Sequence, residues 1–69
     1  MLGIVKKYNN NDGIGYIIGY DDIIYLFREN VIIGDTKIEK NDIVDFEIMI
    51  YNKEELPETV KVKKINKKN

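Results

Sequence analysis

Two short stretches decide the fold of this chain, Asp12-Gly13-Ile14-Gly15-Tyr16-Ile17 and Ile23-Ile24-Tyr25-Leu26-Phe27. Side chains on a β-strand point to opposite sides with a period of two. If a short turn joins the stretches as two antiparallel strands, their outward face carries Ile14, Tyr16, Ile24 and Leu26. We expect function on this face, which bears more aliphatic than aromatic side chains.

Composition narrows the class of protein. The 69 residues suffice for one small domain, and a chain of this length buries only about 60% of its unfolded surface. It has no Cys, His or Trp, so disulfides, thiolate metal sites, the commonest general base and the most reactive nucleophile are excluded. We therefore predict no enzymatic activity, no cofactor and no metal site. Without a membrane-spanning apolar run or an export signal, the predicted location is the cytoplasm, with no membrane partner.

Charge is divided unevenly along the chain. Residues 1–11 carry two lysines and residues 61–69 carry five, with no acid in either, whereas residues 12–58 hold all 12 acids and four cations. If the first and last strands lie close together, the two basic ends form one anion-attracting patch. The alternative is that the C-terminal lysines are a solvated end. We predict a single domain over residues 1–65 and a basic polar tail at 66–69.

Short segments of β-branched and aromatic residues, separated by Gly, Asn and Asp, predict a small all-β domain. The expected strands are Leu2–Tyr8, Ile14–Ile18, Ile23–Phe27, Ile43–Tyr51 and Thr59–Ile65, with a short helical turn just after Phe27. Five such strands are typical of an antiparallel Greek-key barrel, the oligonucleotide-binding fold or OB-fold. An SH3-like barrel has a similar strand count and stays as an alternative.

The same alternation assigns inward faces. The expected inward residues of the last two strands are Val44, Phe46, Ile48, Ile50, Val60 and Val62, and the outward ones include Asp45, Glu47, Lys61 and Lys63.

At this point the residues resemble the cold-shock protein family, from about Gly3 to Ile65. Gly3-Ile4-Val5-Lys6-Lys7-Tyr8-Asn9 is similar to the family's opening Gly-x-Val-Lys-Trp-Phe-Asn, and Gly13-Ile14-Gly15-Tyr16-Ile17 to its first ribonucleoprotein motif, Lys-Gly-Phe-Gly-Phe-Ile. Asp22-Ile23-Ile24-Tyr25-Leu26-Phe27 resembles the second, Asp-Val-Phe-Val-His-Phe, and residues 41–48 the family's Gly-x-x-Val-x-Phe strand. The resemblance implies a five-stranded barrel that binds single-stranded RNA or DNA and acts as an RNA chaperone.

The resemblance also implies a nucleic-acid site. Its expected residues are Lys6, Lys7, Tyr8, Ile14, Tyr16, Asp22, Ile24, Leu26 and Phe27. The family's tryptophan is Lys7 here, the basic residue that opens the first motif is Asp12, and only Tyr16 and Phe27 keep rings at the family's ring positions of the two motifs. A lost stack costs about 1–3 kcal/mol, so three or four lost stacks predict weak, strongly salt-dependent binding. Tyr8 is either a third ring beside the site or a packing residue.

The resemblance also implies that Tyr25 faces inward, because the family has an inward-facing valine at this position. A tyrosine inside a small barrel needs space and a partner for its hydroxyl. Either that hydroxyl reaches the rim of the barrel, or the third strand is shifted.

A second hypothesis comes from the aliphatic character of the face. Ile14, Ile18, Ile24 and Leu26, with Tyr16 and Phe27, form a surface that docks another protein or a second copy of the chain. A third possibility is structural: a register shift of one residue would place these isoleucines in the core. The nucleic-acid hypothesis requires that Tyr16 and Phe27 lie together in solvent.

Overall fold

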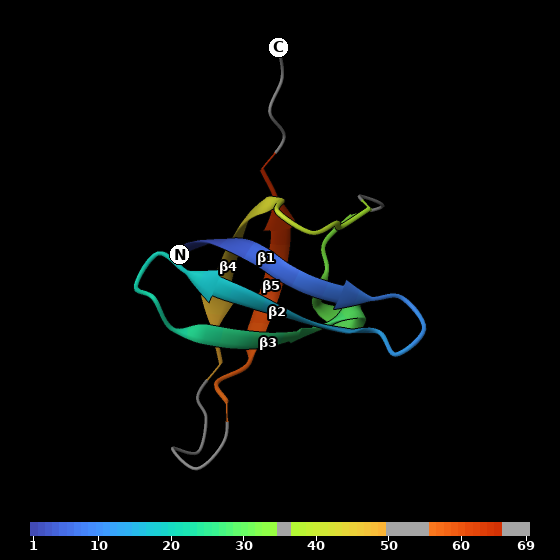
Figure 1. Ribbon diagram of the computed structural model, residues 1–69, viewed down its shortest axis with the longest axis horizontal. Helices are drawn as coiled ribbons and strands as arrows, with labels where there is room; N and C mark the ends of the chain where they lie inside the picture. The colour runs from blue at the N-terminus through green and yellow to red at the C-terminus, as the bar shows by residue number, and fades with distance from the viewer. Residues whose placement is uncertain (35–36, 50–55, 66–69) are drawn as a thin grey trace.

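The structure, a computed structural model, describes residues 1–34, 37–49 and 56–65 (Figure 1). Its elements are strands β1 (Leu2–Asn9), β2 (Ile14–Gly19) and β3 (Ile24–Arg28), the 3₁₀ helix η1 (Glu29–Val31), and strands β4 (Ile43–Ile48) and β5 (Thr59–Lys64). All five expected strands are present, and each begins within one residue of its expected start. The expected helical turn after Phe27 is η1. The expected tail at 66–69 and the expected strand residues 50 and 51 lie outside the described residues.

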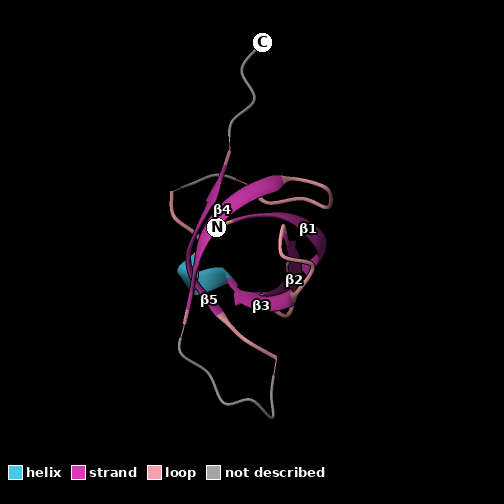
Figure 2. Cartoon of the chain, turned by 90° about the vertical axis from the view of Figure 1, so that its left-hand side faces the viewer, coloured by secondary structure: helices cyan, strands magenta, loops and turns pink. Residues whose placement is uncertain are grey.

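The five strands form one antiparallel sheet in the order β3-β2-β1-β4-β5. The sheet curls until its two edge strands, β3 and β5, meet. In the view of Figure 2 the strands and η1 surround the interior. The Leu26 N–H donates to the Pro57 carbonyl at 2.9 Å, and Leu26 and Glu58 form a parallel bridge. The all-β, barrel-like class predicted from the sequence is therefore confirmed.

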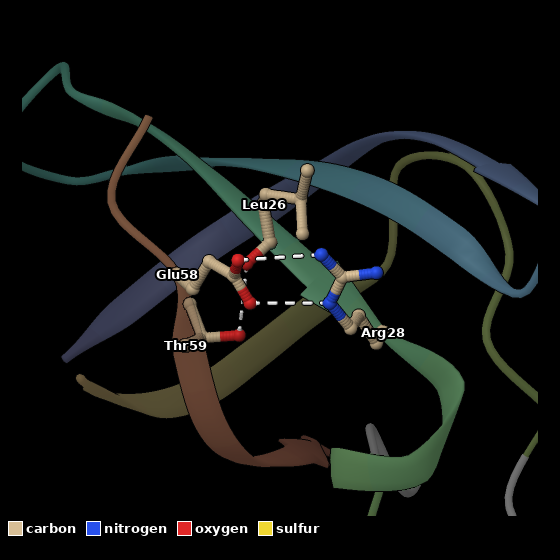
Figure 3. A network of polar contacts seen from close by, with 4 residues as sticks. All are labelled: Leu26, Arg28, Glu58 and Thr59. Carbon is tan, nitrogen blue, oxygen red and sulfur yellow. Dashed lines mark hydrogen bonds and ion pairs between the residues drawn. The ribbon is translucent and has the colours of Figure 1, made fainter. Parts of the chain in front are cut away.

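Side chains strengthen the contact between β3 and β5 (Figure 3). The Thr59 hydroxyl donates to the Leu26 carbonyl at 3.3 Å. The Arg28 guanidinium donates through Nε and Nη2 to the two carboxylate oxygens of Glu58, at 3.2 and 3.4 Å. Because this bidentate ion pair is accessible to solvent, we expect it to contribute little to the free energy of unfolding. Its fixed geometry mainly sets the position of β3 relative to β5.

The interior contains residues from all five strands and from the connection before β4: Val5, Ile17, Tyr25, Phe27, Ile38, Val44, Phe46 and Val62. In β4 the predicted inward residues Val44 and Phe46 are buried, as expected. The prediction for Ile48 was wrong, because this last residue of β4 lies at the end of the interior and is 43% exposed. Ile50 lies outside the described residues.

A bulge in β5 changes which of its side chains face inward. Lys61 and Val62 together lie opposite the single residue Phe46 of β4, and Lys61 adopts a left-handed φ of 56°. The extra residue moves the inward position from Val60, which is partly exposed, to Thr59, which is 1% exposed. The prediction of an inward Val60 was wrong because a period of two assumes an unbroken strand. The predicted burial of Val62 is confirmed.

Tyr25 is accommodated inside because its hydroxyl reaches the rim. The residue is 2% exposed, and its ring contacts that of Phe46 with centroids 5.0 Å apart. Its hydroxyl donates to Asp21 Oδ2 at 2.6 Å, in the turn between β2 and β3. The rim alternative is therefore correct, and β3 keeps the expected register, with Ile24 opposite Ile18.

Gly15 allows two aromatic rings to meet across β2. On the inner side Gly15 lies between Tyr8 of β1 and Phe27 of β3, whose rings stack with centroids 5.3 Å apart and an interplanar angle of 26°. A Cβ at Gly15 would lie 2.5 Å from atoms of the Phe27 ring and 2.6 Å from the Lys7 carbonyl oxygen. Packing therefore requires a glycine at this position.

This close approach predicts the effect of adding a methyl group. Gly15→Ala is expected to lower the free energy of unfolding by about 1–3 kcal/mol or more, because the new Cβ overlaps the Phe27 ring. Phe27→Leu removes the overlapping ring atoms, so the double variant should be less destabilised than the sum of the single variants. Urea unfolding of the four proteins measures this coupling. Additive effects, or a neutral Gly15→Ala, would contradict the assigned packing.

Candidate nucleic-acid interface

An exposed row of isoleucines crosses four strands on the outer side of the sheet. Ile4 of β1 pairs with Ile18 of β2 and with Ile43 of β4, and Ile18 pairs in turn with Ile24 of β3. Paired residues on neighbouring strands place their side chains on the same side of a sheet. Ile4 and Ile24 are 37% and 44% exposed, and Ile18 and Ile43 are half-buried. We call these four residues the isoleucine row.

A second row of paired residues runs parallel to the isoleucine row and contains a tyrosine and a lysine. Lys7 of β1 pairs with Tyr16 of β2, which pairs with Leu26 of β3. Tyr16 and Leu26 are half-buried, and Lys7 is exposed. We call Lys7, Tyr16 and Leu26 the second row. One row further along, Ile14 lies opposite Arg28.

The two rows test the predicted orientation of β2 and β3. The sequence placed Ile14, Tyr16, Ile24 and Leu26 on one outward face, and the pairing of β2 with β3 confirms it. The alternating residue Ile17 is fully buried instead. The alternative of a register shifted by one residue is therefore wrong.

A bulge in β1 brings two lysines to this face. Val5 pairs with Ile17 and Lys7 with Tyr16, so Lys6 is an extra residue with no opposite partner in β2. Bulges of this kind redirect side chains, and here two consecutive residues, Lys6 and Lys7, are both exposed. Neither has an ion pair with any residue in the described part of the chain. Both positive charges are therefore available to an anionic ligand.

An open hollow of about 490 Å³ lies beside these lysines. Its lining residues are Lys6, Lys7, Tyr16, Ile24 and Leu56. Leu56, from the segment that leads into β5, is 47% exposed. The hollow thus combines two cations, one ring and aliphatic side chains, which suits a ligand with a flat apolar part and a negative charge.

Phe27 does not belong to this face. It is fully buried, and it lies opposite Gly15 on the inner side, while its neighbour Leu26 faces outward. The prediction that Tyr16 and Phe27 lie together in solvent was wrong, because β3 pairs with β2 without a bulge and keeps strict alternation. Phe27 packs the core and cannot stack on a base, so the form of the nucleic-acid hypothesis that requires both rings in solvent is wrong. Tyr16 is the ring that the second row carries.

Tyr8 is a packing residue as well. Its half-buried ring stacks on Phe27 at the inner side of the sheet, so of the two alternatives for Tyr8 the packing role is the one observed. Burial, together with the negative charge of Glu29, raises the pKa of the Tyr8 hydroxyl above its ordinary value of 10.0. The hydroxyl therefore stays neutral through the physiological range.

Asp22 occupies the turn between β2 and β3, at the edge of the outer face. It is exposed, adopts a left-handed φ of 70°, and donates its backbone N–H to the Gly19 carbonyl at 2.8 Å. The side-chain hydrogen bond to the turn comes from its neighbour, since Asp21 Oδ1 accepts the Ile23 N–H at 3.0 Å. Neither Asp22 nor Ile14, both expected site residues, is among the residues that line the hollow.

The lysines of β5 do not adjoin those of β1, because β4 lies between the two strands. Two of the β5 lysines lie close to acids. Lys61 lies 3.9 Å from Glu47, and Lys64 lies 3.3 Å from Asp42. The condition for a single basic patch, that the first and last strands lie close together, is therefore not met by β1 and β5. Lys67 and Lys68 lie outside the described residues.

Three residues of this surface were not predicted as site residues from the sequence: Leu56, Ile4 and Ile43. Leu56 belongs to a loop without periodicity, so nothing in its sequence context placed it at the hollow. Ile4 alternates with the buried residues Gly3 and Val5, and this pattern was the available signal for an outward position.

No family model matches this chain, and no curated protein matches it. Among residues 1–34, 37–49 and 56–65, no helix has the length and apolar character needed to cross a bilayer.

The rim contact of Tyr25 predicts a pH dependence of stability. Its hydroxyl holds the pKa of the Asp21 carboxyl below the ordinary value of 3.8, with a smaller contribution from the Ile23 N–H. A carboxyl whose pKa is lower in the folded than in the unfolded chain stabilises the fold above the unfolded pKa, and this stabilisation is lost as pH falls through the folded pKa. Tyr25→Phe should therefore destabilise most at neutral pH and progressively less in acid.

Urea unfolding of the wild type and Tyr25→Phe between neutral and strongly acidic pH measures this difference. Asp21→Asn is the matched control, because an asparagine keeps the turn acceptor for Ile23 but has no titrating carboxyl. In that background the effect of Tyr25→Phe should not change with pH. A difference that stays constant with pH in the wild-type background would show that the contact does not act through ionised Asp21.

Proposed function

We propose that the protein is a cold-shock-like OB-fold protein that binds single-stranded RNA or DNA weakly through the outer face of β1, β2 and β3. The observation that carries the proposal is the bulge at Lys6. It presents Lys6 and Lys7, both without an ion pair in the described chain, beside Tyr16 and the hollow. Proteins bind single-stranded nucleic acids by combining positive charges, which attract the phosphates, with aromatic rings on which the bases stack.

Each part of the face has a distinct role in this proposal. A base stacks on the ring of Tyr16, which contributes about 1–3 kcal/mol and requires no particular base. Lys6 and Lys7 attract the phosphates on either side of that base. Ile24 and Leu56 contact the rest of the base and its sugar. This proposal differs from the two-ring site suggested by the sequence, because Phe27 is buried and the site relies on Tyr16 and two lysines. Binding is therefore weak and mostly electrostatic.

The topology supports the OB-fold and Greek-key part of the proposal. β1 pairs with both β2 and β4, and β3 meets β5 in parallel, so a meander of three strands shares one barrel with a hairpin of two. In an OB-fold the second and third strands face the ligand, and β2 and β3 supply Tyr16, Ile24 and Leu26 here. Weak, sequence-tolerant contact is compatible with the RNA chaperone role that the family resemblance implies.

The contribution of the lysines is tested with a labelled oligothymidine and fluorescence anisotropy at several salt concentrations. Changing Lys6 and Lys7 together to Gln should weaken binding and reduce the slope of log K against log salt by about 1.4, since each phosphate contact with a single strand contributes about 0.7. Lys61→Gln with Lys63→Gln removes the same charge from β5 and is the matched control. Equal losses in the two pairs would show that only net charge matters, and submicromolar affinity that persists in high salt would also contradict the proposal.

The contribution of the ring is tested by Tyr16→Ala. Loss of a stacked base should weaken binding about 5- to 150-fold, with little change in the salt slope, because no charge is removed. Tyr20→Ala is the control, because Tyr20 is an exposed ring, at 59%, in the turn before β3 and is not among the residues that line the hollow. An amide-shift titration with oligouridine locates the contact. Unperturbed amides in β1, β2 and β3 would contradict a site on this face.

A further inference from the structure

The isoleucine row is not explained by nucleic-acid binding. Ile4, Ile18 and Ile43 do not line the hollow, and they carry neither a ring nor a charge. Together with Ile24 they leave an apolar strip across four strands in contact with water. Covering such surface is favourable by about 25 cal/mol per Å², and a continuous exposed strip of this kind usually marks a contact with another protein.

Two opposite charges lie diagonally across this strip. Lys7 lies on β1, on the side of the isoleucine row toward Asn9. Asp22 lies on the opposite side, two residues before Ile24, in the turn that leads into β3. Ile18, on β2, lies between them. Within the described residues neither Lys7 nor Asp22 has an ion pair, so both charges are available to a partner.

We propose that this face docks the same face of a second copy of the chain. The two copies are related by a two-fold axis that lies in the contact plane and passes near Ile18. This axis is perpendicular to the line from Lys7 to Asp22, so it exchanges the two ends of that line. It places each Lys7 against the partner's Asp22 and brings Ile18 against the partner's Ile18. One patch that complements itself in this way is what an isologous dimer requires.

Charge favours a second copy over other occupants of the isoleucine row. The chain has a net charge of −1, so two copies repel each other little. Asp22 repels the phosphates of a nucleic acid but attracts a lysine. Lys7 also belongs to the proposed nucleic-acid site, and a bound strand and a second copy therefore exclude each other from this face.

The experiment measures the mass of the protein against its concentration, by sedimentation equilibrium in low salt without nucleic acid. The wild type should approach twice the monomer mass as concentration rises. Lys7→Glu and Asp22→Lys should each weaken self-association about tenfold or more, because each single variant opposes like charges at both symmetric contacts. An equimolar mixture of the two single variants should associate again, since both contacts of the mixed pair join opposite charges.

Two further variants distinguish a loss of self-association from a loss of folding. Asp22→Asn retains a residue that tolerates the left-handed backbone, and it should weaken association less than Asp22→Lys because it removes an attraction without adding a repulsion. Ile24→Lys, at an exposed position, should also abolish the dimer. A wild type that stays monomeric at millimolar concentration, or a mixture no better associated than either variant alone, overturns the proposal. The sedimentation samples contain no oligonucleotide. A failure of the dimer proposal therefore does not affect the nucleic-acid proposal, which its own titrations test.

Discussion

The contact between β3 and β5 gives this sheet an inside and an outside. Leu26, in the middle of β3, is held through both backbone groups, since its N–H donates to Pro57 and its carbonyl accepts the Thr59 hydroxyl. An open five-stranded sheet would leave one apolar face in water, whereas the curled sheet closes around Phe27 and Phe46. The side chain of Leu26 then points outward, so the residue that joins the two edges also forms part of the candidate binding face.

Two bulges determine which charges that face presents. In β1 the extra residue Lys6 leaves both Lys6 and Lys7 in solvent, on the strand next to Tyr16. In β5 the extra residue Lys61 changes the inward position, and that strand lies along the acids of β4. Lys61 and Lys64 form ion pairs with Glu47 and Asp42, whereas Lys6 and Lys7 form none within the described residues. A chain of net charge −1 therefore has a locally positive surface at Lys6 and Lys7, which have no ion pair in the part of the chain that the structure describes.

Aromatic residues are divided between core and surface by the same geometry. Phe27 and Tyr8 stack over Gly15 inside, where their rings exclude water from the interior. Tyr16 is on the opposite side of the same strand as Gly15, next to aliphatic neighbours. This arrangement leaves little stacking surface and much aliphatic surface outside, and for that reason the face is suited both to weak contact with a single strand and to contact with another protein.

The sequence by itself determined the five strands, the helical turn before the long connection, and the outward side of β2 and β3, because period-two alternation and turn residues are local signals. It also determined the inward position of Tyr25. Tertiary structure alone decided that Lys6 and Lys7 both reach solvent, that Val60 turns outward, and that Leu56 completes the hollow. Bulges, strand order and loop placement depend on contacts between segments far apart in the chain. Phe27 is the exception, since alternation from Leu26 already implied that its ring faces the core, and the family resemblance favoured the opposite.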